Sequence, residues 1–450
     1  MRLAHTQDCL PDLRNPPKNQ NFLVLFFGMV SLSMAVFVPI AFFVECPFYD
    51  EWILAPIVKH ILEGTSTFQD FWMLHNEHRI FFPKLFLSYW AAWTSWDMRV
   101  IPWIDLALIS VAELLLYRLG TKVPSRPLKK MFKDPLFWMI TTLIFSLRAV
   151  HTIISSFQFQ VFLSVALTVI GISWLSLKPT SLRRWFATAV LAMVATYSFA
   201  AGVFFWVAVL PIFWSIRKHH LFGVILTSWI SIALLVVAVY FYHYTRPALH
   251  PGIVSFFDKP VPISYFCMVY LGSIFYSFLL TEPFTAAIGF LGLVLAARYF
   301  IFLIITDKKN DPKAMALAAI MLFVIFGAFL TSVSRVNFGL ETARSERYTP
   351  VTCFFWAALG VTLFEKPRLV KFILIPLLFL SLTSSIFHSL LLASWKNSLM
   401  DQAEMIREYP VNLEKIRGLY LYPNVVEESV RILKDKKLSV FNPTLYPERT

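Results

Sequence analysis

The feature that most constrains this chain is the repetition of apolar runs long enough to cross a lipid bilayer. Five clear examples are residues 21–44, 221–242, 283–306, 314–333 and 369–395, and a membrane-spanning helix needs about 20 residues. Because hydrocarbon offers the backbone no hydrogen-bond partner, such runs must be helical. Only 15% of the residues are charged, against roughly 25% in soluble domains. The sequence therefore predicts an all-α, polytopic integral membrane protein with about 11 to 13 transmembrane helices.

The distribution of basic residues predicts the orientation of these helices. Arg2, Arg14 and Lys18 precede the first run, and cytoplasmic loops carry an excess of Lys and Arg. We expect a cytoplasmic tail (residues 1–20), a transmembrane domain (21–395) with outer loops at 45–80 and 334–350, and an external tail (396–450). The first run is expected to be retained, because no small-residue cleavage site follows it. The net charge of +13 is explained by basic loops, so no nucleic-acid partner is expected.

Two segments leave the number of crossings open. Residues 80–96 and 100–119 are predicted to form a hairpin around Trp96-Asp97-Met98. Two full crossings there would put the basic loop at 122–133 outside, whereas one crossing plus an interfacial helix would put it inside. The same ambiguity applies to residues 263–306.

An acidic pair, Asp50 and Glu51, opens the first outer loop. Residues 51–64 have an apolar side and a polar side, which predicts an amphipathic helix at the membrane interface that ends at Gly64. The structural alternative for the pair is helix capping, with Asp50 as the N-cap. A denser polar cluster follows at His75, Glu77, His78 and Arg79. A salt-bridged network is the structural alternative there, and the spacing is a poor match to a zinc site.

The second outer loop contains Arg335, Arg344 and Arg347, together with Glu341, Glu346 and Tyr348. The positive-inside rule accounts for arginines in cytoplasmic loops but not for arginines on the external side. The planar guanidinium suits bidentate phosphate binding, although arginines also extend towards lipid headgroups. The alternation with acids favours a built site.

Several tracts in the chain resemble bacterial membrane glycosyltransferases of the GT-C superfamily. They are Tyr49-Asp50-Glu51-Trp52, His75-Asn76-Glu77-His78-Arg79-Ile80-Phe81-Phe82-Pro83, Tyr197-Ser198-Phe199-Ala200-Ala201-Gly202, residues 335–348, Leu421-Tyr422-Pro423 and Leu438-Ser439-Val440-Phe441. The resemblance covers about residues 20 to 445.

The resemblance implies sugar transfer, with inversion, from a polyprenyl-phosphate donor to a glycan, lipid or protein acceptor at the outer face of the bacterial plasma membrane. It implies that Asp50 is the base, with Glu51 the adjacent alternative. Donor phosphate would be bound by Arg79, Arg344, Arg347 and Tyr348, and substrate by His75, Glu77, His78, Arg335 and Glu341. Some members of the superfamily use Mg²⁺ or Mn²⁺ and others no metal, and the sequence assigns no metal ligands.

Two other functions stay open at this point. A transporter or lipid flippase would use ionisable residues inside the membrane, and Asp105, Glu113, Arg148 and Arg298 lie in or near apolar runs. A non-catalytic partner in cell-envelope assembly is the third. Whatever the function, we expect helices within 45–79, and a partly helical C-terminal cap with Val426, Val430 and Leu433 packed inward.

Overall fold

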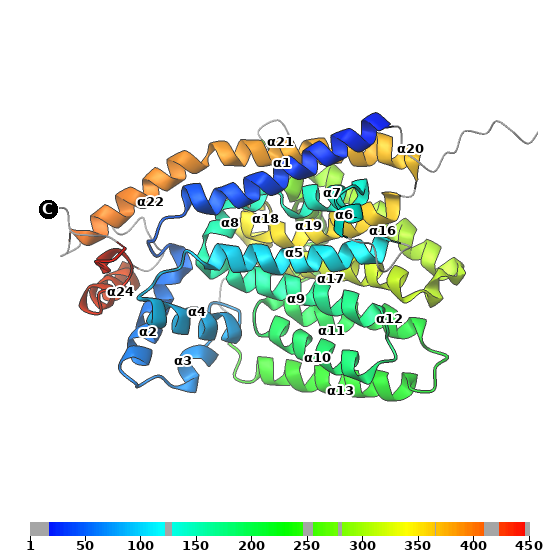
Figure 1. Ribbon diagram of the computed structural model, residues 1–450. Helices are drawn as coiled ribbons and strands as arrows, with labels where there is room; N and C mark the ends of the chain where they lie inside the picture. Colours follow the sequence, from blue (N-terminus) through cyan, green and yellow to red (C-terminus); the bar gives the residue numbers. More distant parts are fainter. Residues whose placement is uncertain are drawn as a thin grey trace, which may run out of the picture.

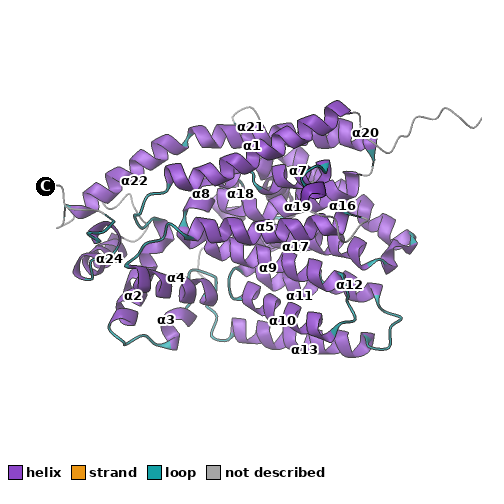
Figure 2. Ribbon diagram, in the orientation of Figure 1, coloured by secondary structure: helices purple, strands orange, loops and turns teal. Residues whose placement is uncertain are grey.

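The computed structural model describes residues 18–121, 128–245, 255–277, 281–364, 366–408 and 423–445. Every regular element in these ranges is a helix, which confirms the all-α prediction (Figure 2). The main helices are α1 (Lys18–Phe42), α2 (Leu54–Leu62), α3 (Phe68–Trp72), α4 (Phe81–Thr94), α5 (Ile101–Gly120), α7 (Pro135–Ile144), α8 (Val150–Ile154), α9 (Phe159–Ser176), α10 (Leu182–Thr196), α12 (Leu210–Ser215), α13 (Phe222–Phe241), α15 (Pro260–Gly272), α16 (Glu282–Ile305), α17 (Pro312–Arg335), α18 (Leu340–Ala343), α19 (Thr349–Phe364), α21 (Ile375–Leu390), α22 (Leu392–Arg407) and α24 (Pro423–Asp435).

Seven helical segments of the described chain are long and apolar enough to cross a membrane. They include all five runs singled out in the sequence and add Pro135–Ile154 and Ser156–Ser176. The predicted total of about 11 to 13 is larger, because it also counted shorter or more charged helices such as α4, α15 and α19. A multi-pass membrane protein follows from these spans. The predicted N-terminal tail lies almost entirely outside the described residues.

The two ambiguous segments each contain one short helix and one longer helix. Helix α4 has 14 residues, about 21 Å, which is shorter than the roughly 30 Å hydrocarbon core. Helix α5 has 20 residues and is long enough. The two are joined by a tight turn in which Ser95 and Trp96 adopt positive φ. Likewise α15 has 13 residues and α16 has 24. Of these four helices, α16 is among the seven candidate spans and α5 is not.

The first loop is helical, as predicted, and packs against the C-terminal segment at one end of the bundle (Figure 1). Helix α2 buries Leu54, Ala55, Ile57 and Val58, and Trp52 of the preceding turn is buried too, so the segment has the predicted apolar side. The residues before α2, Tyr49–Ile53, form a 3₁₀-helix.

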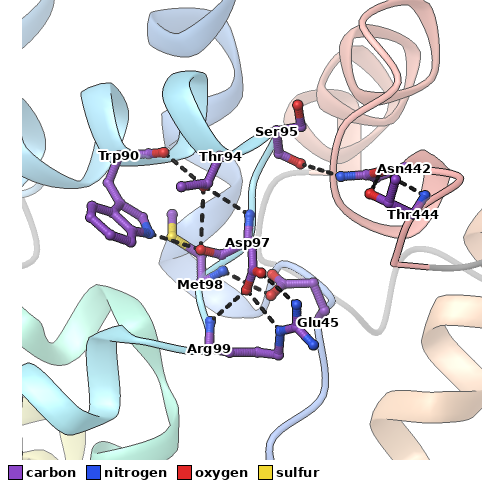
Figure 3. Close-up of polar contacts among 9 residues, drawn as sticks. All are labelled: Glu45, Trp90, Thr94, Ser95, Asp97, Met98, Arg99, Asn442 and Thr444. Atoms are coloured by element: carbon purple, nitrogen blue, oxygen red, sulfur yellow. Dashed lines mark hydrogen bonds and ion pairs between the residues drawn. The ribbon is translucent and has the colours of Figure 1, made fainter.

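The C-terminal segment is partly helical, and Val426, Val430 and Leu433 of α24 are fully buried, as predicted. The tract Leu421-Tyr422 lies outside the described residues. Figure 3 shows how the end of the chain contacts the α4–α5 turn: Asn442 Nδ2 donates a hydrogen bond to the Ser95 carbonyl at 3.3 Å. In the same view, Glu45 accepts a hydrogen bond from the Met98 amide at 2.8 Å.

Helices α15 and α16 approach closely through two glycines. A Cβ atom on Gly289 would lie 1.9 Å from the Met268 carbonyl oxygen, and one on Gly272 would lie 2.0 Å from the Thr285 carbonyl oxygen. Small residues allow this kind of backbone contact between membrane helices. We expect Gly289→Ala to destabilise the protein by about 1–3 kcal/mol through overpacking, measured as a lower thermal unfolding temperature in detergent. Gly223→Ala is the matched control, since nothing lies within 4 Å of its added methyl. Equal unfolding temperatures for the two variants would contradict this packing.

Candidate functional site

Polar side chains from both predicted outer loops gather at the end of the bundle that the first loop covers. They line two cavities, which we call the polar pocket and the adjoining cavity. The polar pocket holds about 50 Å³, and its lining includes His75, Glu77, His78, Arg335 and Tyr348. The adjoining cavity holds about 550 Å³, and its lining includes Tyr49, His151, Glu346 and Trp395. Asp50, Gln158 and Arg347 line both, so the two spaces are neighbours.

The two acids of the pair, Asp50 and Glu51, have different surroundings. Asp50 lies in the 3₁₀-helix Tyr49–Ile53 and faces both cavities. Glu51 is buried, and its two carboxylate oxygens accept hydrogen bonds from the Phe48 amide at 3.2 Å and the Phe157 amide at 3.1 Å. The structural alternative of helix capping holds for the pair in part: both acids lie in the first turn, but the N-cap residue is Phe48 rather than Asp50, and the acid that bonds its amide is Glu51.

A tight turn presents the histidines. The backbone amides of His75 and His78 each donate to the other's carbonyl at 2.9 Å, and Asn76 adopts a positive φ of 50°. Asparagine tolerates this left-handed conformation well. The turn places His75 Nε2 3.5 Å from Asp50 Oδ2, and the His75 ring packs edge-on against Phe157. His75 therefore contacts the carboxylate that faces both cavities.

Glu77 links the two loops by contacting Arg335 at the end of α17. His78 Nε2 lies 3.4 Å from the same carboxylate. Burial lowers the pKa of His78 to about 4, so at neutral pH this ring is uncharged. The ion pair between Glu77 and Arg335 supports the salt-bridged network, which was the structural alternative for this cluster.

A second ionic group lies across the adjoining cavity. Glu346 Oε1 lies 3.1 Å from Arg148 Nη1, and Glu346 Oε2 lies 2.7 Å from His151 Nδ1. Burial acts to raise the pKa of Glu346, but the hydrogen bond from His151 and the charge of Arg148 outweigh burial and lower this pKa. The indole of Trp395 packs against His151, with ring centroids 5.1 Å apart. This carboxylate is therefore already neutralised by its neighbours.

The predicted phosphate-binding residues are not all in one place. Arg347 lines both cavities, and its buried Nε finds no hydrogen-bond acceptor among the described residues. Arg79 is buried, and its guanidinium donates to the backbone carbonyls of Trp72, Tyr240 and Tyr242. Arg344 lies over the Tyr276 ring at 4.6 Å and lines neither cavity. Of the three arginines, Arg347 alone faces the space where a ligand could bind.

The other predicted residues divide in a similar way. His75, Glu77, His78, Arg335 and Tyr348 line the polar pocket. Glu341 is exposed on the short helix α18 and lines neither cavity. Phe199, Ala200 and Ala201, from the tract that resembles the GT-C group, line the polar pocket as well.

Sequence reasoning assigned no site role to Arg148, His151, Gln158 and Gln160. All four lie within the apolar spans Pro135–Ile154 and Ser156–Ser176. Ionisable residues inside such spans usually line a polar cavity, which is the signal that could have identified Arg148 and His151. From the sequence alone, this signal at Arg148 supports the transporter alternative.

The buried Glu51 predicts a pH dependence of stability. Burial raises its pKa to about 7, above the value of about 4.3 in an unfolded chain. The folded state then binds the proton more tightly, so stability should fall by about 4 kcal/mol between roughly pH 4.3 and 7 and stay level above. Thermal unfolding at pH 5, 6, 7 and 8 measures this, and Glu51→Gln should flatten that part of the profile. Glu341→Gln is the exposed control, and an unchanged slope in Glu51→Gln would sink the explanation.

Among the described residues, no group of three or more His, Cys, Asp or Glu side chains is placed to hold a metal ion. Comparison of the chain with protein families, with curated proteins and with solved structures finds no match.

Proposed function

We propose that this protein is a membrane glycosyltransferase that moves a sugar from a polyprenyl-phosphate donor to an acceptor in the cell envelope. The observation that carries the proposal is that Asp50 and Arg347 line the same cavity of about 550 Å³. This volume lies within the usual range of ligand sites, roughly 300–1,000 Å³. A carboxylate and a guanidinium are the two groups that such a transfer needs most.

The chemistry assigns a role to each. A hydroxyl of the acceptor is a weak nucleophile, so a positioned base must take its proton as the oxygen attacks the anomeric carbon. We assign this base to Asp50. The bond from the anomeric carbon to the phosphate oxygen breaks, and the carrier phosphate leaves with the electron pair. Arg347 would stabilise the charge that develops on that phosphate, and attack opposite the leaving group inverts the anomeric centre.

Glu51 is the weaker candidate for the base, although a pKa of about 7 suits a general base. Both of its oxygens accept backbone hydrogen bonds. The space beside it holds only about 10 Å³, which is at the lower limit for one water molecule. A base must first reach its proton, and the geometry therefore favours Asp50.

The position of the site supports a lipid-linked donor. Helix α17 ends at Arg335 beside the polar pocket, so the site lies near the ends of the membrane-spanning helices. A polyprenyl phosphate could then place its phosphate in the cavity while its chain stays in the bilayer. We further propose that this end faces away from the cytoplasm in a bacterial plasma membrane, because the basic loops around residues 308–313 and 366 lie at the opposite end.

Transfer in proteoliposomes tests the proposal. The purified full chain would be supplied with radiolabelled hexosyl and pentosyl polyprenyl phosphates and with envelope extract as acceptor. We expect label to move from the donor into acceptor with at least one donor, and to stay on the donor in protein-free liposomes. Intact donor after long incubation with the whole panel would count against a glycosyltransferase.

One observation keeps a transporter in view as the second candidate. Asp105 of α5 is fully buried, and neither carboxylate oxygen has a hydrogen-bond partner among the described residues. Buried acids within membrane helices often lie on ion or proton pathways. The same proteoliposomes distinguish the two functions, since a flippase would move fluorescent polyprenyl phosphate between leaflets and leave the sugar bond intact.

A further inference from the structure

A third cavity lies at the opposite end of the bundle from the candidate site. It holds about 570 Å³, and its lining includes Thr121 after α5, Lys308 and Asp311 before α17, and Lys366 after α19. Helix α17 has 24 residues and runs from this cavity to Arg335, a distance of about 36 Å. That length is close to the thickness of a bilayer core, so the two sites belong to opposite membrane faces.

The charges in this cavity are strongly unbalanced. Arg298, Lys308, Lys313 and Lys366 line it, and among the described residues Asp311 is the one acid in the lining. Asp311 lies 3.5 Å from Lys308 Nζ, which is exposed, so this weak pair neutralises little of the excess. Lys313 is half-buried, and Arg298 is exposed on α16. The cavity therefore attracts anions.

Most of the remaining lining is apolar. Leu295 and Phe302 of α16 line the cavity with Leu317 and Val361. Phe302 is 43% exposed and Ile301 is 58% exposed. Because these exposed side chains are apolar, we expect this side of α16 to face hydrocarbon. Arg298 lies seven residues before the end of α16 at Ile305, about 10 Å deeper in the membrane along the helix. A cation at that depth beside apolar walls suits a phosphate that carries acyl chains better than a free ion.

From these features we propose that the cavity binds the headgroup of an anionic phospholipid, with the phosphate between Arg298 and Lys313 and the acyl chains along α16. Basic pockets between membrane helices bind such headgroups. This site does not depend on the sugar-transfer function, because it involves none of the residues assigned to it.

Native mass spectrometry of the full chain in neutral detergent tests the proposal. Dioleoyl phosphatidylglycerol would be titrated against dioleoyl phosphatidylcholine, which has the same chains and no net charge. We expect at least tenfold tighter binding of phosphatidylglycerol. Arg298→Gln with Lys313→Gln should weaken that binding roughly 10- to 30-fold. The control, Arg183→Gln with Lys218→Gln, removes the same charge from exposed positions outside the lining and should change binding less than threefold.

A variant that is expected to bind phosphatidylglycerol more tightly distinguishes an effect on the site from misfolding. Asp311 accepts a hydrogen bond from the Lys313 amide at 3.0 Å as the N-cap of α17, and asparagine caps about as well. Asp311→Asn should therefore keep the fold and tighten phosphatidylglycerol binding about fivefold. Equal binding of the two lipids, or unchanged affinity in both cavity variants, would overturn the proposal. Binding of inorganic phosphate without phosphatidylglycerol would show that the cavity takes a free anion and that the lipid assignment is wrong.

Discussion

Asp50→Asn is expected to reduce sugar transfer by about 100- to 10,000-fold, the usual cost of removing a general base. Asparagine keeps the shape of the side chain and its place beside His75, but it cannot accept a proton at neutral pH. Asp50 caps no helix, so this change should leave the unfolding temperature nearly unaltered. Initial rates of label transfer from a polyprenyl-phosphate sugar, with thermal unfolding of the same preparation, measure both effects.

Glu51→Gln is the matched control, because it makes the same chemical change one residue away. Its carboxylate bonds backbone amides rather than facing either cavity, so transfer should fall less than tenfold while the pH profile of stability changes. If Glu51→Gln abolishes transfer and Asp50→Asn does not, the base is Glu51. If both variants transfer sugar at the parent rate, the acidic pair is structural and the transporter becomes the leading candidate.

The fold was predictable from the sequence to the extent that bilayer physics determines it. Apolar length alone identified the long spans, and the helical spacing of Val426, Val430 and Leu433 identified the buried side of α24. The number of spans was less predictable, because a short helix such as α4 has the composition of a spanning helix without its length. Only the structure shows that α4 packs against the first-loop helices α2 and α3.

The residue types at the site were predictable from the sequence, but the directions in which their side chains point were not. Asp50 and Glu51 are adjacent and chemically alike, and only the backbone geometry after Tyr49, with its positive φ of 45°, decides which one faces the cavities. The arginines show the same limit. Arg79 and Arg347 have equal charge, yet one is held by backbone carbonyls and the other faces open space. Contacts between distant segments determine that difference, and one sequence does not reveal them.

Arg347→Ala is expected to raise the KM for the polyprenyl-phosphate donor by about 10- to 100-fold, since a hydrogen bond to a charged group contributes roughly 1.5–3 kcal/mol. The phosphate is also the leaving group, so kcat should fall with it. Arg347→Lys keeps the charge but loses the planar fork, and it should restore only part of the donor affinity.

Arg344→Ala separates a specific contact from a general loss of positive charge. The sequence alone predicts weaker donor binding when either arginine is replaced, whereas the structure places Arg344 over Tyr276 and outside both cavities. We therefore expect Arg344→Ala to raise the donor KM less than threefold. Equal effects of the two alanine variants on KM would mean that the loop acts through its overall charge, and the assignment of the phosphate to Arg347 would then be wrong. A fall in kcat with no change in KM for Arg347→Ala would instead place its contact in the transition state alone, because an interaction made only there lowers turnover without weakening donor binding.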